Sequence, residues 1–544
     1  MKRIGGKDMT VLQSILLGGC YWLSSIYLGT ITESFFRFPL CNVLLVGLIL
    51  GDVPTAMIIG ATIMPAYLAF INAGSVAPAD QAAAGIVPAT CVIAYGMNPD
   101  VAIALAVPVS LLFAQLWTLN KSLYSFWYSF ADKCAEKLNF KGITLAHIVF
   151  PAVQKIITMW IPMSLILYFG GSWLSNAASV LPATVTAGLG VVSKAMPAIG
   201  FAMVMKMIGR SDLMPFFFVG FFFVQYTQVG TMVVAIVAIF IAYLDYRYGT
   251  KDNNNEEGIF DLLKKRNDER SEEYKVVTKK DITTCYHRWW ITAFMSDGFE
   301  RMKGLCFAWS ILPILRKVYK DKPDELRKAI QRHLLFYNTE ASIGGTLIEG
   351  IVISMEEQKA RGEDVPEETV INVKNALMGP FAGIGDTINL VNLRPLILSL
   401  FVAYGLKGYW WAAVVPILIL LAITQFEGYN LVHLGYRLGT RAASNLLQSG
   451  QIQKIISFFG VLGLFAMGGM SASMVKVTLG IMIPTGGTPL NLQTGLLDAI
   501  LPGIPVLVVI LLLYKYLKKG GKMLNAMLAL LVGTFILGFL GILV

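Results

Sequence analysis

Long uncharged apolar stretches dominate the chain and determine its predicted architecture. Seven of them contain no Asp, Glu, Lys or Arg: 9–32, 101–120, 156–193, 213–244, 408–426, 455–475 and 523–544. A helix crosses a hydrocarbon core about 30 Å thick with about 20 apolar residues. Because lipid offers no hydrogen bonds to the backbone, each stretch is predicted to be a helix, whereas a barrel would show short alternating strands. The pattern predicts an all-α, polytopic membrane protein.

Prolines and glycines interrupt the apolar sequence of the N-terminal half. No charge lies between Asp52 and Asp80, yet three prolines and two glycines fall there: Pro54, Pro65, Pro78, Gly60 and Gly74. Irregular backbone at membrane depth is tolerated where protein or a water-filled cavity surrounds it, and such segments point to a transporter's binding site. We therefore expect broken or re-entrant helices here. Proline-kinked helices that pack against one another are the alternative.

A charged segment divides the chain into two halves. Residues 245–281 include 19 charged residues among 37, which predicts a solvated linker on the cytoplasmic side. The predicted N-terminal domain is therefore 1–244 and the C-terminal domain 282–544. The stretches IGFAMVMK (199–206) and LGLFAMGG (462–469) echo each other, which is typical of transporters built from two similar halves.

The C-terminal domain begins with helices that are too charged to span a membrane. Between 282 and 375, apolar residues recur at helical spacing among many charges, which predicts amphipathic helices at the cytoplasmic face. The charges over 316–333 are expected to form a solvated or lipid-facing surface; a surface that receives an acidic partner is the alternative. Spans resume over 376–544. The four lysines of KYLKKGGK (515–522) predict a cytoplasmic turn, with the C-terminus outside.

Composition excludes several other classes of protein. Of 544 residues, 56% are hydrophobic and 14% charged, and the mean hydropathy is +0.64. A soluble domain carries about 25% charged residues, so a cytosolic enzyme, a disulfide-rich secreted protein and a disordered chain are excluded. The net charge of +10 fits basic cytoplasmic loops in contact with lipid and does not indicate nucleic-acid binding. The scattered cysteines and histidines predict no metal, cofactor or catalytic group.

Ionisable side chains next to apolar stretches are the candidates for substrate binding, because each costs at least about 2.5 kcal/mol at the bilayer centre. Glu33 follows an uncharged run and has aromatic residues on both sides. Asp80 ends the proline-rich segment, and Asn72 lies eight residues before it. Carboxylates and amides bind paired sugar hydroxyls, while aromatic rings cover the C–H face of a sugar. Helix ends that face water are the alternative for Glu33 and Asp80.

Two further candidates lie in the C-terminal half. The sequence GPFAGIGDTIN (379–389) is neither a P-loop nor a dinucleotide fingerprint. We expect its glycines to break a helix and expose Asp386 at the tip of a re-entrant hairpin; close helix packing through small residues is the alternative. Asn338 in FYNTE (336–340) is the second candidate, with an ordinary cap or turn amide as the alternative.

These residues resemble a known transporter family. RFPLCNVLLVGLILGD (37–52), IIGATIMPAYLAFINAGSVAPAD (58–80) and GFAMVMKMIGRSDLMPFFFVG (200–220) resemble the IIC component of mannose-type sugar phosphotransferase permeases. In the C-terminal half, FERMKGLCFAWSILPILRKVY (299–319), RHLLFYNTEASIGGTLIEGIVISMEE (332–357) and VKNALMGPFAGIGDTINLVNLRP (373–395) resemble the IID component. The chain is thus similar to a fusion of IIC and IID.

The resemblance implies a function. Such IIC and IID subunits have similar folds in opposite orientations, assemble as a trimer of pairs, and move a sugar inward across the bacterial inner membrane by an elevator-like shift of a core domain. Phosphoryl groups travel on histidines of separate cytoplasmic IIA and IIB proteins, and phospho-IIB modifies the sugar. A facilitator or secondary transporter uncoupled from phosphate is one alternative, and a membrane receptor or scaffold is another.

The resemblance also assigns residues. Glu33 resembles the acidic residue after the first IIC helix, and Asn72 and Asp80 resemble the pair that flanks the family's Gly-Ala-Pro-rich turn. Asp386 resembles the aspartate of the IID Gly-x-Gly-Asp motif. Met64 stands where IIC chains commonly have Gln or Glu, and INLVN (388–392) replaces a stretch that often holds aromatic and Gly-Thr residues. These departures leave the transported sugar open.

Overall fold

The chain is almost entirely helical in the computed structural model, which describes residues 9–29, 32–68, 79–170, 182–208, 211–248, 276–448, 450–484 and 490–544. The N-terminal half contains α1 (Val11–Ser25), η1 (Thr32–Phe36), α3 (Pro39–Leu50), α4 (Val53–Tyr67), α5 (Gln81–Tyr95), α6 (Pro99–Glu136), α7 (Phe140–Thr144), η3 (Leu145–Val149), α8 (Phe150–Lys155), η4 (Ile156–Trp160), α9 (Ile161–Leu165), η5 (Ile166–Gly170), α11 (Ala183–Ala195), α12 (Pro197–Ile208), η6 (Ser211–Leu213), α13 (Met214–Thr227) and α14 (Thr231–Tyr248).

The C-terminal half has the same character, with one small sheet among the described residues. Its helices are α16 (Lys279–Thr292), α17 (Gly304–Val318), α18 (Pro323–His333), η8 (Ala341–Gly345), α19 (Thr346–Ala360), α20 (Glu367–Gly385), η9 (Asp386–Leu393), α21 (Arg394–Gly405), α22 (Trp411–Gln448), α23 (Gly450–Met474), η10 (Gln493–Leu497), α24 (Asp498–Ile500), α25 (Ile504–Lys518) and α26 (Met523–Phe539). Strands β1 (Met482–Ile483) and β2 (Leu490–Asn491) pair antiparallel. Most of the predicted linker, 249–275, lies outside the described residues.

The long helices agree with the prediction of a polytopic membrane protein. Within the part of the chain that the structure describes, six helices or continuous helical runs are long and apolar enough to span: Pro99–Glu136, Phe140–Gly170, Thr184–Lys206, Glu367–Gly405, Trp411–Gly439 and Ile456–Met474. The pair Gln493–Ile500 and Ile504–Lys518, bent by 69°, raises the number to seven if it forms one span. The apolar stretches 101–120, 408–426 and 455–475 overlap these spans, so the prediction of spanning helices is confirmed there.

Three uncharged stretches contain helices shorter than predicted, and in 523–544 the helix α26 has 17 residues. Stretch 9–32 contains α1, which has 15 residues and ends at Ser25. Stretch 213–244 divides into α13 and α14, because Gln228 adopts a left-handed conformation (φ 53°) and ends α13. The lengths of the uncharged stretches therefore predicted helices longer than the observed ones, because the backbone turns inside these apolar stretches.

Helix caps explain the short helices of the N-terminal half. Gly51 (φ 86°) ends α3, and the Asp52 carboxylate accepts from the backbone N–H of Thr55 to start α4. Asp80 caps α5 in the same way, through Ala83. Side-chain caps and left-handed glycines satisfy the free backbone groups at helix ends. At 12 to 15 residues, α3, α4 and α5 are too short to cross a membrane, in agreement with the predicted broken segment.

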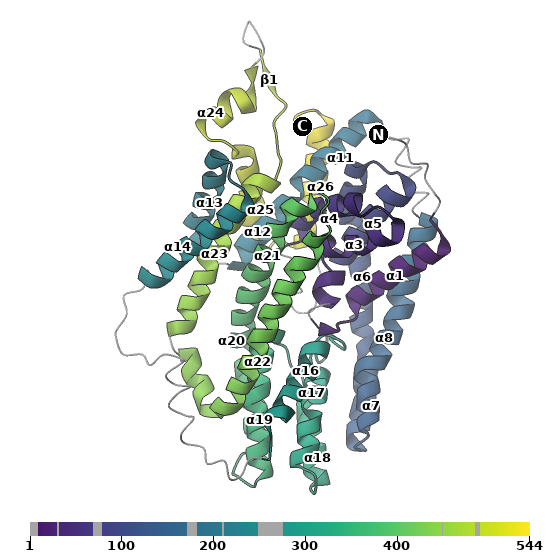
Figure 1. Cartoon of the computed structure of the whole chain (residues 1–544), viewed down its shortest axis with the longest axis vertical. Coiled ribbons are helices and arrows are strands. Elements are labelled where there is room, and N and C mark those ends of the chain that lie inside the picture. Colours follow the sequence, from purple (N-terminus) through teal and green to yellow (C-terminus); the bar gives the residue numbers. More distant parts are fainter. Residues whose placement is uncertain are drawn as a thin grey trace.

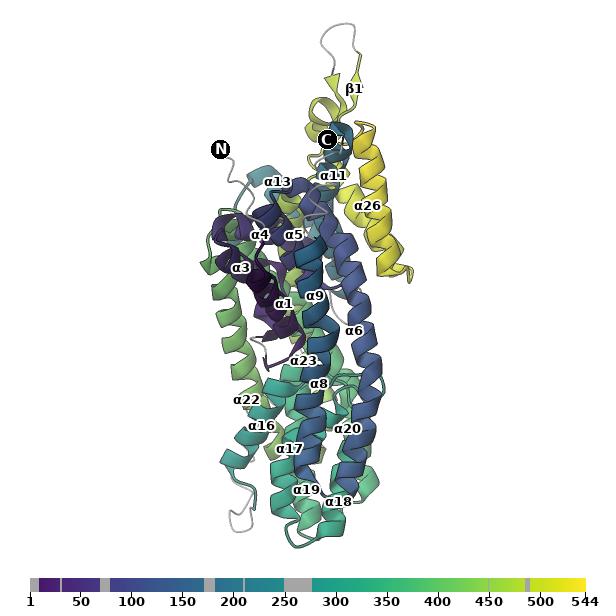
Figure 2. The ribbon, with the colours of Figure 1, turned by 90° about the vertical axis from the view of Figure 1, so that its right-hand side faces the viewer.

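The helices form an elongated bundle with two hydrophobic cores (Figures 1 and 2). Helices α16–α19 lie at one end, while β1, α24 and the C-terminus lie at the other. The larger core contains α3–α5, α11–α14 and α23, and the smaller contains α16–α19. Helix α6 belongs to both, through Trp117 in the larger core and Tyr124 in the smaller.

The smaller core contains charges that the sequence pattern assigned to the surface. Most of the charged residues over 316–333 are exposed, in agreement with the prediction: Arg316, Lys317, Lys320, Asp321, Lys322, Asp324 and Lys328. Arg332 and His333 are buried, which corrects the expectation at these two positions. Arg332 donates through Nε and Nη2 to both oxygens of Glu356, each at 2.7 Å, and these bonds hold the pKa of Glu356 well below its usual range. Burial lowers the pKa of His333 to about 4, so the neutral ring contacts Glu356.

Glycines set the closest helix contact in this part of the chain. A Cβ on Gly350 of α19 would overlap the carbonyl oxygen of Val432 of α22, and one on Gly435 of α22 would overlap the carbonyl oxygen of Leu347. The two backbones therefore touch, and the absence of a side chain is required at both positions.

Replacing Gly350 should destabilise the chain although alanine favours helices. We expect Gly350→Ala to lower the free energy of unfolding in detergent by about 1–3 kcal/mol, because the added methyl separates α19 from α22. Gly379→Ala is the matched control, since nothing lies within 4 Å of its added carbon, and it should be neutral or slightly stabilising. Equal midpoints for the two variants in thermal unfolding would contradict the close contact.

Candidate functional site

Asp80 is a buried carboxylate that joins three helices. It precedes α5 and accepts hydrogen bonds from Tyr21 Oη of α1 at 2.5 Å, Trp117 Nε1 of α6 at 2.8 Å and the backbone N–H of Ala83 at 2.9 Å. Both carboxylate oxygens are therefore occupied within the protein. Such saturated, charge-assisted bonding fixes the geometry of α1, α5 and α6 around one point. Asn72, the predicted companion of Asp80, lies outside the described residues.

Glu33 connects the two halves of the chain. It lies in η1, and its Oε1 is 3.3 Å from Arg394 Nη1 of α21 and 3.9 Å from Arg37 Nη1. The Glu33 and Arg394 side chains are 12% and 17% exposed, so the pair is largely shielded from solvent. Arg37 also donates to Tyr27 Oη at 2.9 Å. The predicted acidic residue of the N-terminal half thus has its nearest cation in the C-terminal half.

Aromatic rings continue this contact between the halves. The rings of Tyr27 and Phe294 lie 4.9 Å apart, and Lys303 Nζ lies 4.7 Å from the centre of the Phe294 ring. Gly29 has φ 76°, and a Cβ there would meet the Trp290 ring at 2.8 Å. The turn after α1 therefore packs directly on the last turn of α16, through Trp290, and on Phe294 just after it.

Asn338 lies on the C-terminal side of this aromatic bridge. Its Oδ1 accepts from Lys303 Nζ at 2.8 Å, and the same ammonium donates to the carbonyl of Thr339 at 3.0 Å. Asn338 thus lies beside the positive charge that contacts Phe294. Its Nδ2 points to no hydrogen-bond acceptor among the described residues, so the amide retains donors for a ligand.

Asp386 lies within a continuous helix, so the prediction that it lies at the tip of a re-entrant hairpin is wrong. Helices α20, η9 and α21 form one run, Glu367–Gly405, that is long enough to span a membrane. The backbone adopts π-helical turns over Asp386–Leu393, where Arg394 N–H bonds to Asn389 C=O. The π-helical turns change the backbone hydrogen bonding locally, and the helix continues through them. Such segments are frequent at functional sites.

Three carboxylates and an amide lie around this π-helical segment. Asn389 Nδ2 is 3.4 Å from Glu340 Oε1 and 3.1 Å from Glu427 Oε2 of α22. A Cβ on Gly385, next to Asp386, would lie 2.6 Å from Glu340. Both Lys303 and Arg394 interact electrostatically with Asp386, which connects this cluster to Asn338 and to Glu33.

Sequence reasoning missed several charged residues of the site. Lys121 Nζ pairs with Asp297 at 3.1 Å, and Lys155 Nζ donates to Ser25 C=O at 2.6 Å. Lys155 also lies within 6 Å of the Tyr27, Trp117 and Tyr124 ring centres. These lysines border the apolar stretches 101–120 and 156–193 directly, and Arg394 and Glu427 lie inside spanning helices, so the rule that selected Glu33 could have found all four.

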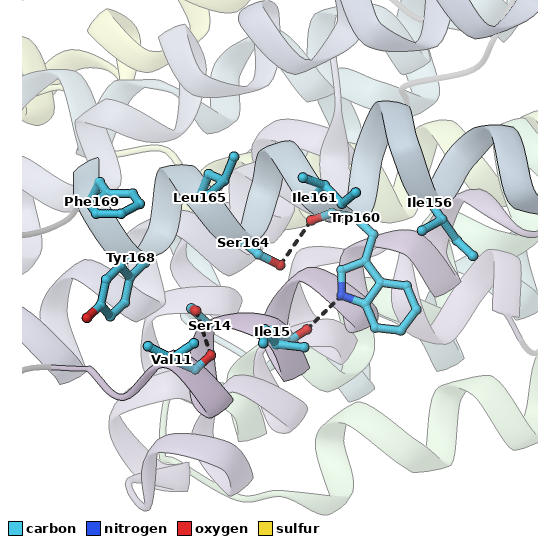
Figure 3. Close-up of a pocket in the computed structure, with 10 residues that line it drawn as sticks. All are labelled: Val11, Ser14, Ile15, Ile156, Trp160, Ile161, Ser164, Leu165, Tyr168 and Phe169. Atoms are coloured by element: carbon cyan, nitrogen blue, oxygen red, sulfur yellow. Dashed lines mark hydrogen bonds between the residues drawn. The ribbon is translucent and has the colours of Figure 1, made fainter.

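A separate cavity of about 550 Å³ lies between α1 and the run from η4 to η5 (Figure 3). Its lining is mostly apolar and includes Ile15, Ile161 and Phe169. The hydroxyls of Ser14 and Ser164 donate to carbonyls of their own helices, so they are not directed at a ligand. The cavity offers no charged group and no convergent donors, and we do not assign a sugar to it.

Comparison with known proteins identifies the family. The family described as "PTS system sorbose-specific iic component" matches residues 11–244, and "PTS system mannose/fructose/sorbose family IID component" matches 276–543. The sorbose-specific EIID component of Lacticaseibacillus casei is 32% identical over 257 residues, covering 46% of this chain and 88% of that protein. The sorbose-specific EIIC component of Klebsiella pneumoniae is 30% identical over 218 residues, covering 40% and 82%.

The chain belongs to the mannose family of the phosphotransferase system. It is a fused IIC–IID sugar permease of that family, which confirms the resemblance seen in the sequence. A cryo-EM structure titled as the mannose transporter ManYZ in complex with microcin E492 is 28% identical and covers 49% of this chain and 97% of that one, with a TM-score of 0.30.

Removing one donor to Asp80 should test its structural importance in this permease. We expect Tyr21→Phe to lower the free energy of unfolding by about 1.5–3 kcal/mol, because a buried carboxylate loses a hydrogen bond. Tyr226→Phe is the control, since Tyr226 is 64% exposed. Thermal unfolding of the two purified variants in detergent measures the difference, and equal midpoints would show that Tyr21 is dispensable.

Proposed function

We infer that this IIC–IID chain moves a sugar inward across a bacterial inner membrane and presents it to a cytoplasmic phospho-IIB protein. The observation that supports this proposal most directly is the Glu33–Arg394 contact. It joins the two halves at a polar region inside an otherwise apolar body. In this proposal, 1–244 is the IIC-like translocating domain, 245–281 the cytoplasmic linker and 282–544 the IID-like domain. Within the last, 282–375 lies at the cytoplasmic face and 376–544 in the membrane.

The proposed sugar site combines hydrogen-bonding groups with aromatic faces. Glu33, Asn338 and Asp386 supply carboxylate and amide groups for hydroxyls, and Tyr27 and Phe294 supply rings for the C–H face of the sugar. Asn72 remains a predicted contact. Asp80 has both oxygens occupied, so we propose that it positions α1, α5 and α6 around the sugar rather than binding it.

We further propose an elevator-like movement and a homotrimer of the fused chain, with IIA and IIB as separate phosphocarriers. Two of the four histidines are buried and offer no accessible ring nitrogen to a phosphate donor. Both ring nitrogens of His147 contact hydroxyls, of Ser296 and Thr292, and His333 contacts Glu356 through Nε2. A phosphoryl acceptor needs an accessible ring nitrogen, which a separate IIB protein would provide.

Coupling to phosphorylation is testable in cells. We expect sugar to accumulate as its phosphate when the chain is expressed with IIA and IIB, and not to accumulate when the accepting histidine of IIB is replaced. Uptake of labelled sugar and chromatography of the cell extract separate the two forms. Accumulation of unmodified sugar without functional IIB would instead support a facilitator or secondary transporter.

Glu33 allows a test against a non-transporting receptor. We expect Glu33→Gln to reduce initial uptake at least about tenfold, because the variant loses an anionic hydrogen-bond acceptor and leaves Arg394 without its closest carboxylate. Expression and detergent extraction should persist. Glu363→Gln, at an exposed turn, is the control and should transport normally. Unchanged uptake by Glu33→Gln would favour a receptor or scaffold.

A further inference from the structure

The apolar cavity between α1 and the helical run Phe140–Gly170 shares no lining residue with the polar site (Figure 3). Its volume is about 550 Å³, and its ten lining residues include no charged side chain. The hydroxyls of Ser14 and Ser164 donate to the carbonyls of Val11 and Trp160 in their own helices. Water inside a protein needs several hydrogen-bond partners, so a cavity with this lining favours an apolar ligand.

The cavity opens on the outer face of a membrane-spanning run. Six of its ten lining residues are exposed: Val11, Ile15, Ile161, Leu165, Tyr168 and Phe169. Among the spans found in the described residues, Phe140–Gly170 is the least enclosed by protein, with 28% of its most apolar stretch buried. Exposed apolar side chains of a spanning helix contact lipid tails. The acyl chains of the bilayer therefore reach the opening of the cavity.

Close helix contacts fix the walls of the cavity. A Cβ on Gly18 of α1 would overlap the hydroxyl of Ser164 and would lie 2.8 Å from the carbonyl oxygen of Trp160. The indole N–H of Trp160 donates to the carbonyl of Ile15 at 2.8 Å. Small residues allow such close approach between membrane helices. The cavity thus lies beside a contact that holds α1 at a fixed distance from the spanning run.

We propose that this cavity binds one acyl chain of a membrane phospholipid. Tyr168 lines the cavity two residues before the run ends at Gly170, and tyrosine is typical of the boundary between membrane and water. The acyl chain lies in the cavity in this arrangement, and the headgroup stays at the membrane surface beside Tyr168. The site is separate from sugar binding and does not depend on which sugar is transported.

Two other occupants fit the cavity less well. A free fatty acid would bring a carboxylate, for which the lining offers no charged partner, whereas a phospholipid keeps its polar group outside. A second copy of the chain would need a larger surface, because a stable protein interface takes about 20–30 residues on each side and ten residues line this cavity. The phospholipid tail matches the shape, the chemistry and the position of the site.

Photochemical labelling tests the proposal on the purified full-length chain in detergent. The probe is one equivalent of phosphatidylglycerol with a photoreactive diazirine in one acyl chain, and mass spectrometry of peptides locates the adducts. We expect the adducts to concentrate in 11–15 and 156–169. Ordinary palmitoyl-oleoyl phosphatidylglycerol and phosphatidylethanolamine should compete equally, because the headgroup lies outside the cavity. Dihexanoyl phosphatidylglycerol should compete at least about tenfold less well, since each buried methylene contributes about fourfold in affinity.

A variant that fills the cavity ties the adducts to this site. Leu165→Trp should lower the adduct yield in 11–15 and 156–169 at least about tenfold, because the indole takes the space of the acyl chain. Leu112→Trp is the matched control, since Leu112 of α6 is also exposed but does not line the cavity. Thermal unfolding without added lipid shows whether each variant is folded, and the competition experiment on the wild-type chain needs no variant.

Each alternative gives a different result. Adducts spread evenly over the exposed surface, or equal competition by the dihexanoyl lipid, overturn the proposal. Competition by oleate as strong as that by palmitoyl-oleoyl phosphatidylglycerol assigns the cavity to a free fatty acid and also overturns it. A changed oligomeric state of Leu165→Trp with unchanged adducts assigns the surface to a contact between copies. In all these cases the proposed sugar transport still stands.

Discussion

The contact between Glu33 and Arg394 is the constraint on which the rest of the site depends. The two residues are 361 positions apart and belong to different halves of the chain. An ionised side chain inside an apolar body is tolerated only when it is paired, and removing one partner of a buried pair costs about 3–5 kcal/mol. Glu33 also has Arg37 of its own half at 3.9 Å, but its closest cation belongs to the other half. Separating the halves would remove that closest contact from Glu33 and from Arg394.

The same need for compensation organises the neighbouring residues. The Asp80 carboxylate is stabilised by directed donors from Tyr21 and Trp117, and Lys121 pairs with Asp297 across the two halves. These bonds hold α1, α5 and α6 against the segment that follows α16. The aromatic pair Tyr27–Phe294 fills the space between the ionic contacts. Polar groups that are satisfied within the protein thus form a rigid frame where the two halves meet.

Sequence patterns predicted the membrane helices and the broken helices between Asp52 and Asp80, because hydrophobic length and the positions of proline and glycine are local signals. The caps at Asp52 and Asp80 were not predicted. The patterns failed where the outcome depends on backbone geometry or on distant partners. The glycines before Asp386 suggested a break, but π-helical turns keep the helix continuous. Arg332 and His333 looked like surface charges, since nothing near them in sequence reveals Glu356 as their partner. Lys155 was overlooked because it stands at the edge of an apolar stretch, where a lysine ordinarily reaches water.

Mutual neutralisation also explains the advantage of one chain that carries both components. If each half lacks its closest ionic contact when alone, unpaired halves are less stable in the membrane and must find each other quickly. A covalent connection replaces that encounter by an intramolecular one, with an effective concentration set by the connecting segment. It also fixes the ratio of the halves at one to one. Ion pairs and aromatic contacts then specify how the halves meet, and the connection needs only to be long enough to permit it.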